Sequence, residues 1–247
     1  MCGIIGILGR NQVAPQLVEA LRRLEYRGYD SAGVATVDGE GQLDRRRAVG
    51  KLVNLSDLLV LDPLEGHAGI GHTRWATHGA ATEGNAHPHK HGPVAVVHNG
   101  IIENFRELRA DLAAHGIAAQ TETDTETVAL LTGHHMAQGM SPVDAVRATL
   151  SRLQGAFALA FLFEGEADLM IGARKGSPLA LGHGDGEMFL GSDAIALAPF
   201  TDRITYLEDG DHVVITRAGA AIFDRENRQT SRDTARIDVG ATAIDKG

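Results

Sequence analysis

Residue 2 is the first candidate for chemistry, because Cys2 is the only cysteine among the 247 residues. Removal of Met1 would place a free α-amino group beside its thiol. Such an amine has a pKa of about 7.7–8.0, so it is partly neutral at neutral pH and can accept the thiol proton. One residue could then be both nucleophile and general base, with Gly3 leaving the thiol open to a substrate. The alternative is a small apolar side chain buried in a strand.

A nucleophile that attacks a carbonyl also needs hydrogen-bond donors for the oxyanion that forms. In VAVVHNGIIEN an apolar strand pattern ends at His98, Asn99 offers a side-chain amide and Gly100 offers an unobstructed backbone N–H. One such donor contributes roughly 3–4 kcal/mol of transition-state stabilisation. The alternative is that Asn-Gly is simply a turn, a role this dipeptide often has.

Two further motifs hold groups that can bind a substrate. HTRWATHG places Arg74, Thr77 and His78 at the end of an apolar strand pattern, and an arginine there can hold a carboxylate with two hydrogen bonds. TETDTET places Asp124 just before a helix pattern, where its carboxylate can bind an ammonium group. The alternative is that these acids are only favoured by the helix dipole. Together, the arginine and the aspartate suit a free amino acid.

The motif NAHPHKHG alternates His87, His89 and His91, which share one side only if the chain is extended. Pro88 and Gly92 favour a loop, and the sequence has no second cluster of ligands, so no metal site is predicted. A single cysteine also excludes an intramolecular disulfide and cysteine-rich zinc sites. The role of the three histidines stays open.

The composition is that of a soluble globular protein, with 43% hydrophobic and 22% charged residues. A net charge of -9 argues against binding nucleic acid through the overall field. No apolar run approaches the ~18 residues of a membrane-spanning helix, and nothing basic precedes IIGIL as in a signal peptide. We therefore expect a cytoplasmic protein with neither a nucleic-acid nor a membrane partner.

Apolar periodicity predicts both helices and strands. The helix patterns cover residues 13–28, 103–116, 125–139 and 141–155. The strand patterns cover residues 2–8, 31–37, 68–76, 92–100, 155–163, 168–174, 187–193, 211–216 and 220–224. Between 156 and 223 the strands are joined by short turns without helices, so they pair antiparallel. Because some strands are apolar on both faces, we predict an α+β fold, a four-layer αββα sandwich with two antiparallel sheets between helical layers.

Residues 2–225 are predicted to form one domain. Residues 226–247 are polar and lack a clear period, so they are interpreted as a linker that leaves the core.

Six motifs, in this order, resemble the class II glutamine amidotransferases, whose nucleophile is the N-terminal residue. They are CGIIGI, RRLEYRGYDSAG, HTRWATHG, NAHPH, VVHNGIIEN and TETDTE, and the similarity covers residues 2–215. HTRWATHG and TETDTE favour the branch of the glucosamine-6-phosphate synthases over the phosphoribosylpyrophosphate amidotransferase and asparagine synthetase branches. The resemblance implies an N-terminal-nucleophile hydrolase fold, L-glutamine as substrate, and no cofactor or metal. It assigns Cys2 as the nucleophile, and Asn99 with Gly100 as the oxyanion hole.

The same resemblance implies how glutamine would be held. Arg74 would bind its α-carboxylate and Asp124 its α-ammonium group, with Thr77 and His78 lining the pocket. Trp75 would belong to a loop that closes over bound glutamine.

Synthases of this branch continue into a sugar-phosphate isomerase domain, which is missing from this sequence. We expect the full-length form to be a homo-oligomer in which ammonia from glutamine converts fructose 6-phosphate into glucosamine 6-phosphate. One alternative is a glutaminase domain that serves a different acceptor. Another is a module that senses glutamine and binds it without turnover.

Overall fold

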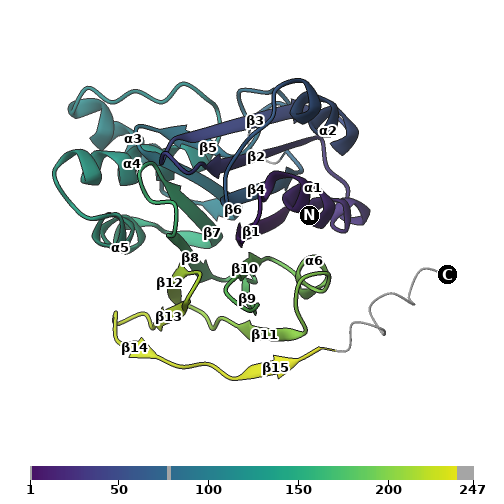
Figure 1. The fold of residues 1–247 in the computed structure, drawn as a ribbon. Helices are drawn as coiled ribbons and strands as arrows, with labels where there is room; N and C mark the ends of the chain where they lie inside the picture. Colours follow the sequence, from purple (N-terminus) through teal and green to yellow (C-terminus); the bar gives the residue numbers. More distant parts are fainter. Residues whose placement is uncertain (1, 77–78, 238–247) are drawn as a thin grey trace.

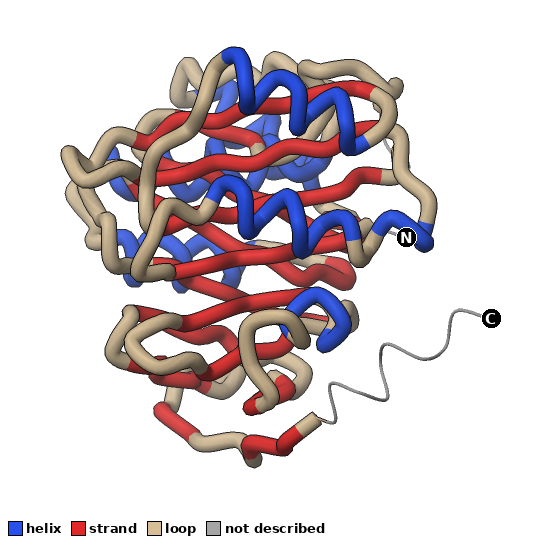
Figure 2. The backbone as a smooth tube through the Cα atoms, turned by 45° about the vertical axis from the view of Figure 1, so that its right-hand side comes forward, coloured by secondary structure: helices blue, strands red, loops and turns tan. Residues whose placement is uncertain are grey.

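Two antiparallel sheets pack face to face, and helices cover both outer faces (Figures 1 and 2). The structure, a computed structural model, describes residues 2–76 and 79–237. The layers follow one another as helices, an eight-stranded sheet, a seven-stranded sheet and helices again. The predicted αββα sandwich is therefore confirmed.

The eight-stranded sheet has the order β15-β11-β9-β10-β1-β4-β2-β3. Its strands are β1 (Gly3–Leu8), β2 (Ser31–Val37), β3 (Leu43–Val49), β4 (Ala68–Arg74), β9 (Ala180–His183), β10 (Met188–Gly191), β11 (Arg203–Tyr206) and β15 (Thr234–Arg236). Strand β1 lies in the middle of the sheet, paired with β4 on one side and β10 on the other. Cys2 therefore directly precedes a central strand.

The seven-stranded sheet has the order β14-β13-β12-β8-β7-β6-β5. Its strands are β5 (His89–His91), β6 (Val94–Ile102), β7 (Gly155–Phe163), β8 (Met170–Lys175), β12 (His212–Thr216), β13 (Gly219–Phe223) and β14 (Gln229–Thr230). Strands β6 and β7 pair along their whole lengths, so the register of the HNG motif is fixed by β7.

Helices on each outer face bury an apolar stripe against the sheet beneath them. They are α1 (Ala14–Arg22), α2 (Leu52–Leu61), α3 (Phe105–Ala114), α4 (Asp124–Ala137), α5 (Pro142–Arg152) and the one-turn α6 (Ala194–Leu197), with a 3-10 turn, η1 (Glu25–Arg27), after α1. Helices α1, α2 and α6 pack with the eight-stranded sheet, and α3, α4 and α5 with the seven-stranded sheet. Each sheet thus has an apolar outer face as well as an apolar inner one, as the continuous apolar strands require.

The core between the sheets is built from alternate residues of the strands. Strand β1 turns Ile4 toward the other sheet and Ile5 toward α1. Strand β6 likewise turns Val97 inward and Val96 toward the helices of the second layer. This alternation decides which polar residues at the strand ends can meet between the two sheets.

Several elements differ from the sequence-based expectations. The helix predicted over 13–28 ends at Arg22 and is followed by η1. The helix predicted over 141–155 begins as expected, with the Ser141 hydroxyl accepting the N–H of Asp144, but ends at Arg152. The one-turn helix α6 lies between β10 and β11, where the sequence predicts only short turns.

Other elements have no counterpart in the apolar pattern. Strand β3 buries only Leu43 fully, because it is an edge strand whose remaining side chains are charged or partly exposed. The sequence predicts an irregular linker from residue 226, yet β14 and β15 pair there with β13 and β11. Edge strands form through backbone hydrogen bonds and need no apolar side chains, so periodicity does not detect them.

Candidate active site

Polar side chains replace apolar ones at one end of the core between the sheets. On β4, Ala68 and Ile70 point into that core, and His72 and Arg74 follow on the same face. On β6, Asn99 follows Val97 in the same way. The ends of three strands from both sheets therefore bring polar groups together beside Cys2.

The Cys2 thiol is half-buried and lies against the backbone of Trp75. The Trp75 N–H donates to Sγ at 3.3 Å, and Sγ lies 3.7 Å from the Trp75 carbonyl oxygen. Burial raises the pKa of the Cys2 thiol, while the Trp75 hydrogen bond and the Arg74 charge act in the opposite direction. The net effect is a protonated thiol at neutral pH, so a base must remove its proton before it can attack a carbonyl.

The Asn99 side chain contacts Cys2 directly. Its Nδ2 donates to the Cys2 carbonyl oxygen at 3.1 Å, and its Oδ1 lies 2.9 Å from Nε2 of His72. Asn99 lies within β6, where it pairs with Ala158, so the alternative of a simple turn is wrong. The amide nitrogen is thus held on the side of the nucleophile.

Gly100 is exposed and has a φ of 118°, a conformation that favours glycine. A Cβ at this position would lie 2.1 Å from the carbonyl oxygen of Ala156 on the neighbouring strand. Only glycine can therefore combine this backbone with the β6–β7 pairing. Gly100 lines the same pocket as Cys2, and its role in an oxyanion hole stays a prediction.

Arg74 and Asp124 line the same pocket as Cys2. This small pocket is lined by Cys2, Arg74, Trp75, His87, His98, Gly100, Thr123, Asp124 and Thr125. The Arg74 guanidinium is buried and donates to the carbonyl oxygens of Gly79 and Ala80 at 3.0 and 3.2 Å. Asp124 is the first residue of α4, and its Oδ2 accepts the N–H of Ile102 at 2.7 Å. An opposite charge thus stands on each side of the thiol.

Trp75 is about half exposed, at 51%, and its indole packs against Gly28. Gly28 has a φ of 73°, and a Cβ there would come within 2.9 Å of the indole ring. Thr77 and His78, predicted to line the pocket, lie outside the described residues. Trp75 marks the point where the chain leaves β4 toward them.

Sequence reasoning did not assign a role to the buried histidines behind the pocket. The ring centroids of His72 and His87 lie 4.2 Å apart, and those of His87 and His89 lie 5.0 Å apart. Burial lowers the pKa of His72 to about 3 and holds those of His87 and His89 well below their usual value. All three are neutral at neutral pH. The position of His72, two residues before Arg74 on one strand, was the signal that could have revealed it.

No group of three or more histidine, cysteine, aspartate or glutamate side chains suited to a metal ion occurs within 2–76 and 79–237. His89 belongs to strand β5, although the sequence favours a loop there. Its Nε2 lies 2.9 Å from Oγ1 of Thr123, the residue that caps the start of α4. Of the histidines of this motif, His87 therefore lines the pocket and His89 is hydrogen-bonded to its frame.

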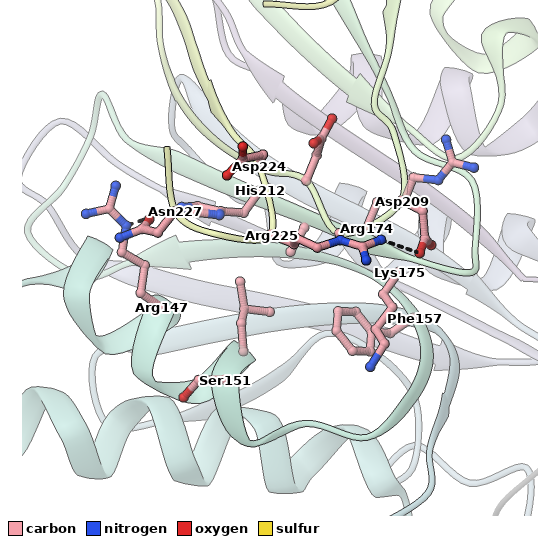
Figure 3. Close-up of a pocket in the computed structure, with 14 residues that line it drawn as sticks. Arg147, Ser151, Phe157, Arg174, Lys175, Asp209, His212, Asp224, Arg225 and Asn227 are labelled. Carbon is pink, nitrogen blue, oxygen red and sulfur yellow. Dashed lines mark hydrogen bonds and ion pairs between the residues drawn. The ribbon is translucent and has the colours of Figure 1, made fainter. Parts of the chain in front are cut away.

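A larger groove lies away from Cys2, between α5 and the strands β8, β12 and β13 (Figure 3). It has a volume of about 1290 Å³, and Arg147, Arg174, Asp209, His212, Asp224 and Arg225 are among its lining residues. None of the predicted site residues that the structure describes lines this groove.

Two antiparallel sheets between helices, with a cysteine at the start of a central strand, define the N-terminal-nucleophile class of amidotransferase folds. Glutamine phosphoribosylpyrophosphate amidotransferase from B. subtilis, complexed with ADP and GMP, shares this fold with a TM-score of 0.79 and 26% identity, over 92% of this chain and 50% of that one. A structure of the allosteric regulatory enzyme of purine biosynthesis has a TM-score of 0.77 and 28% identity, over 91% of this chain and 49% of that one. Residues 72–199 match the glutamine amidotransferase domain, and the chain belongs to this family.

Curated relatives agree with this assignment. The glutamine–fructose-6-phosphate aminotransferase [isomerizing] of Brucella abortus biovar 1 (strain 9-941) is 62% identical over all 247 residues, which are 40% of its own length. The protein of the same name from Caulobacter vibrioides is 55% identical, over 100% of this chain and 41% of its own. The chain thus spans about 40% of the length of these relatives. Among the described residues, no helix is long and apolar enough to cross a membrane.

Proposed function

We propose that this chain hydrolyses the side-chain amide of L-glutamine to glutamate and ammonia, through a γ-glutamyl thioester on Cys2. The observation that carries the proposal is the hydrogen bond from Asn99 Nδ2 to the Cys2 carbonyl oxygen. It holds an amide donor next to the nucleophile, on the strand that also presents Gly100. Family membership supports the same reaction.

The proposed reaction begins after removal of Met1, when the α-amine of Cys2 accepts the thiol proton. The thiolate attacks the side-chain carbonyl carbon of glutamine, and the electron pair of the C=O bond moves onto oxygen. Donors from Asn99 and Gly100 stabilise this oxyanion. The α-ammonium group then protonates the departing nitrogen, and ammonia leaves as the thioester forms. Water attacks the thioester, releasing glutamate and restoring the thiol.

Substrate binding follows from the charges on the two sides of the pocket. Arg74 holds the α-carboxylate of glutamine, and Asp124 holds its α-ammonium group. Thr77 and His78, which lie outside the described residues, would also bind glutamine, and Trp75 would belong to a loop that closes over it. Closure of such a loop keeps water from the reacting groups. The reaction needs no cofactor or metal.

The names of the curated relatives support a wider role for the longer protein. Residues 2–225 would form the glutaminase domain, and residues 226–247 would lead toward a sugar-phosphate isomerase domain. Ammonia released at Cys2 would pass to that domain and convert fructose 6-phosphate into glucosamine 6-phosphate. The full-length protein would be a cytoplasmic homo-oligomer.

The test is glutamate release from L-glutamine by the purified chain, after intact-mass measurement has verified that Met1 is absent. We expect release by the wild-type chain and none by Cys2→Ala, which should still bind glutamine in calorimetry. Cys2→Ala probes the nucleophile, and a sample that retains Met1 probes the α-amine. Binding without turnover in a correctly processed chain would refute the proposal and favour a glutamine-sensing module.

A further inference from the structure

We infer that His72 is a positioning residue for the reaction, because it fixes the Asn99 amide with its nitrogen toward Cys2. The inference rests on the proposed function. His72 belongs to β4 of one sheet and Asn99 to β6 of the other, so their contact crosses the core between the sheets. It does so at the point where that core becomes polar.

Hydrogen-bond chemistry determines which way the Asn99 amide faces. The Cys2 carbonyl oxygen can only accept, so the group 3.1 Å from it must be the amide nitrogen. The amide oxygen then faces Nε2 of His72 at 2.9 Å, and Nε2 must carry the hydrogen. His72 is therefore the donor that pairs the oxygen end of the amide. Without it, one hydrogen bond alone would hold Asn99, and the amide could rotate away from Cys2.

The surroundings of His72 suit a neutral imidazole with its hydrogen on Nε2. The residue is fully buried, and Nδ1 has no hydrogen-bond partner among the described residues. Burial outweighs the hydrogen bonds with Asn99 and the His98 backbone, so the imidazole stays neutral. A donor at the amide oxygen also polarises the amide and strengthens its remaining N–H as a donor. His72 thus acts on the oxyanion through Asn99, without touching the substrate.

The histidine ring is held in place by its neighbours. His87 packs on His72 with 37° between the ring planes, and His89 meets His87 nearly edge-on. His89 in turn lies 2.9 Å from the hydroxyl of Thr123, the residue before Asp124. A continuous row of buried rings therefore connects the Asn99 amide with the start of α4. This row accounts for the buried histidines of the NAHPH motif.

A double-mutant cycle tests whether His72 acts through Asn99. The variants are His72→Phe, Asn99→Ala and the double variant, with His72→Gln as the conservative change that keeps a donor. We expect His72→Phe to lower kcat by about 10–100-fold, the range typical of residues that orient a catalytic group. The KM for glutamine and the Kd for glutamate should change less than about 3-fold, since an oxyanion donor acts in the transition state. The double variant should match Asn99→Ala, and His72→Gln should recover most of the activity.

His212→Phe is the matched control, because it changes a buried histidine that lines the larger groove and not the Cys2 pocket. Its kcat should stay within about 2-fold of wild type, as expected for independent sites. The inference would be overturned if the fold-decreases in kcat of the two single variants multiplied in the double variant. A His72→Gln variant as slow as His72→Phe, or a higher KM with an unchanged kcat, would also overturn it.

A measurement without turnover separates this inference from the proposed function. The side-chain amide signal of Asn99 in NMR should shift in His72→Phe, and its hydrogens should exchange with solvent at least about 10-fold faster, since one hydrogen bond is lost. The His72→Gln spectrum should resemble wild type, and it also serves if His72→Phe fails to fold. An unchanged Asn99 signal in a folded variant overturns the inference even if the chain is active. An inactive wild-type chain with the expected NMR changes would instead refute only the proposed function.

Discussion

Two hollowed regions of the molecule differ in kind, and the smaller one holds the candidate chemistry. The groove beside α5 is much larger than the Cys2 pocket. In the groove, charged groups are paired with one another: Asp211 accepts two hydrogen bonds from Arg232, and Arg147 donates to His212. At the Cys2 pocket, the polar groups come from the ends of strands in both sheets and meet beside the Cys2 backbone.

The candidate site is therefore distinguished by polar groups that converge from several strands, and not by the size of its pocket. Polar groups inside an apolar core cost free energy unless every one is hydrogen-bonded. The fold accepts that cost at the ends of β1, β4 and β6, where the polar groups contact one another or the pocket. In the groove, the buried Asp211 carboxylate is instead satisfied locally, by two hydrogen bonds from Arg232. Four substitutions or conditions can sharpen or break this contrast.

Asn99→Ala should have the largest effect, because it removes a donor aimed at the developing oxyanion. We expect kcat to fall by about 100–1000-fold, or roughly 3–4 kcal/mol, with a small change in KM. Steady-state glutamate release measures it. Asn227→Ala, which changes an asparagine lining the groove, is the control and should leave kcat unaltered. Equal losses in the two variants would abolish the contrast between the regions.

Gly100→Ala should have the second-largest effect, which is a decrease in the free energy of unfolding. The new Cβ would meet the backbone oxygen of Ala156 at 2.1 Å, so the β6–β7 pairing must shift, and the cost should be about 2–4 kcal/mol. Gly210→Ala in the groove also has a positive φ, of 90°, but its Cβ would meet Cβ of Arg225 at 3.0 Å, a much smaller overlap, and should cost about 1–2 kcal/mol. Urea unfolding compares them. A larger loss for Gly210→Ala would contradict the geometric argument.

Asp124→Asn should weaken substrate binding while leaving the fold intact. Asparagine can still accept the N–H of Ile102, but it lacks the charge that attracts an ammonium group. The KM for glutamine should rise by about 10–100-fold, the weight of one charged hydrogen bond. The groove variant Asp209→Asn provides the comparison and should keep the wild-type KM. An Asp124→Asn chain with an unaltered KM would remove this carboxylate from the proposed site.

The smallest effect concerns acid stability, because both regions bury a histidine. Burial, with a contribution from Arg147, lowers the pKa of His212 from 6.5 to about 4. Between these values the unfolded chain binds a proton that the folded chain does not. The contribution of neutral His212 to the free energy of unfolding is therefore fully present above about pH 6.5, and it falls as the pH drops toward 4. His212→Gln should reduce the slope of the unfolding free energy against pH by up to ~1.4 kcal/mol per pH unit. The part of the slope that comes from buried His72 should remain. Urea unfolding at several pH values measures it, and identical slopes would contradict the expectation.

The candidate site residues stand out in the sequence because their types are unusual for their positions. Cys2 stands before an apolar strand, and Asn99 and Gly100 end another, so each is visible without a structure. The pairing of His72 with Asn99 could not be predicted. It joins strands of different sheets, and periodicity along one strand does not reveal which strand lies opposite.

The same reasoning explains which elements of the fold escaped prediction. Amphipathic helices such as α5 and buried strands such as β7 have strong apolar periods and caps, and they were found. Strand β3 contains three consecutive arginines, which hide its alternation. Strand β15 is exposed at all three residues, so it has no apolar alternation that would reveal it.

The two short strands of the tail have a practical consequence. Strand β14 completes one edge of the seven-stranded sheet and β15 one edge of the eight-stranded sheet, so the tail runs across the bottom of both (Figure 1). A recombinant fragment trimmed at residue 225 would keep Cys2 and its neighbours, yet would leave β13 and β11 with unsatisfied backbone donors and acceptors. Sheet edges with unpaired backbone groups can pair with strands of other molecules. We therefore expect a fragment that ends at residue 225 to aggregate.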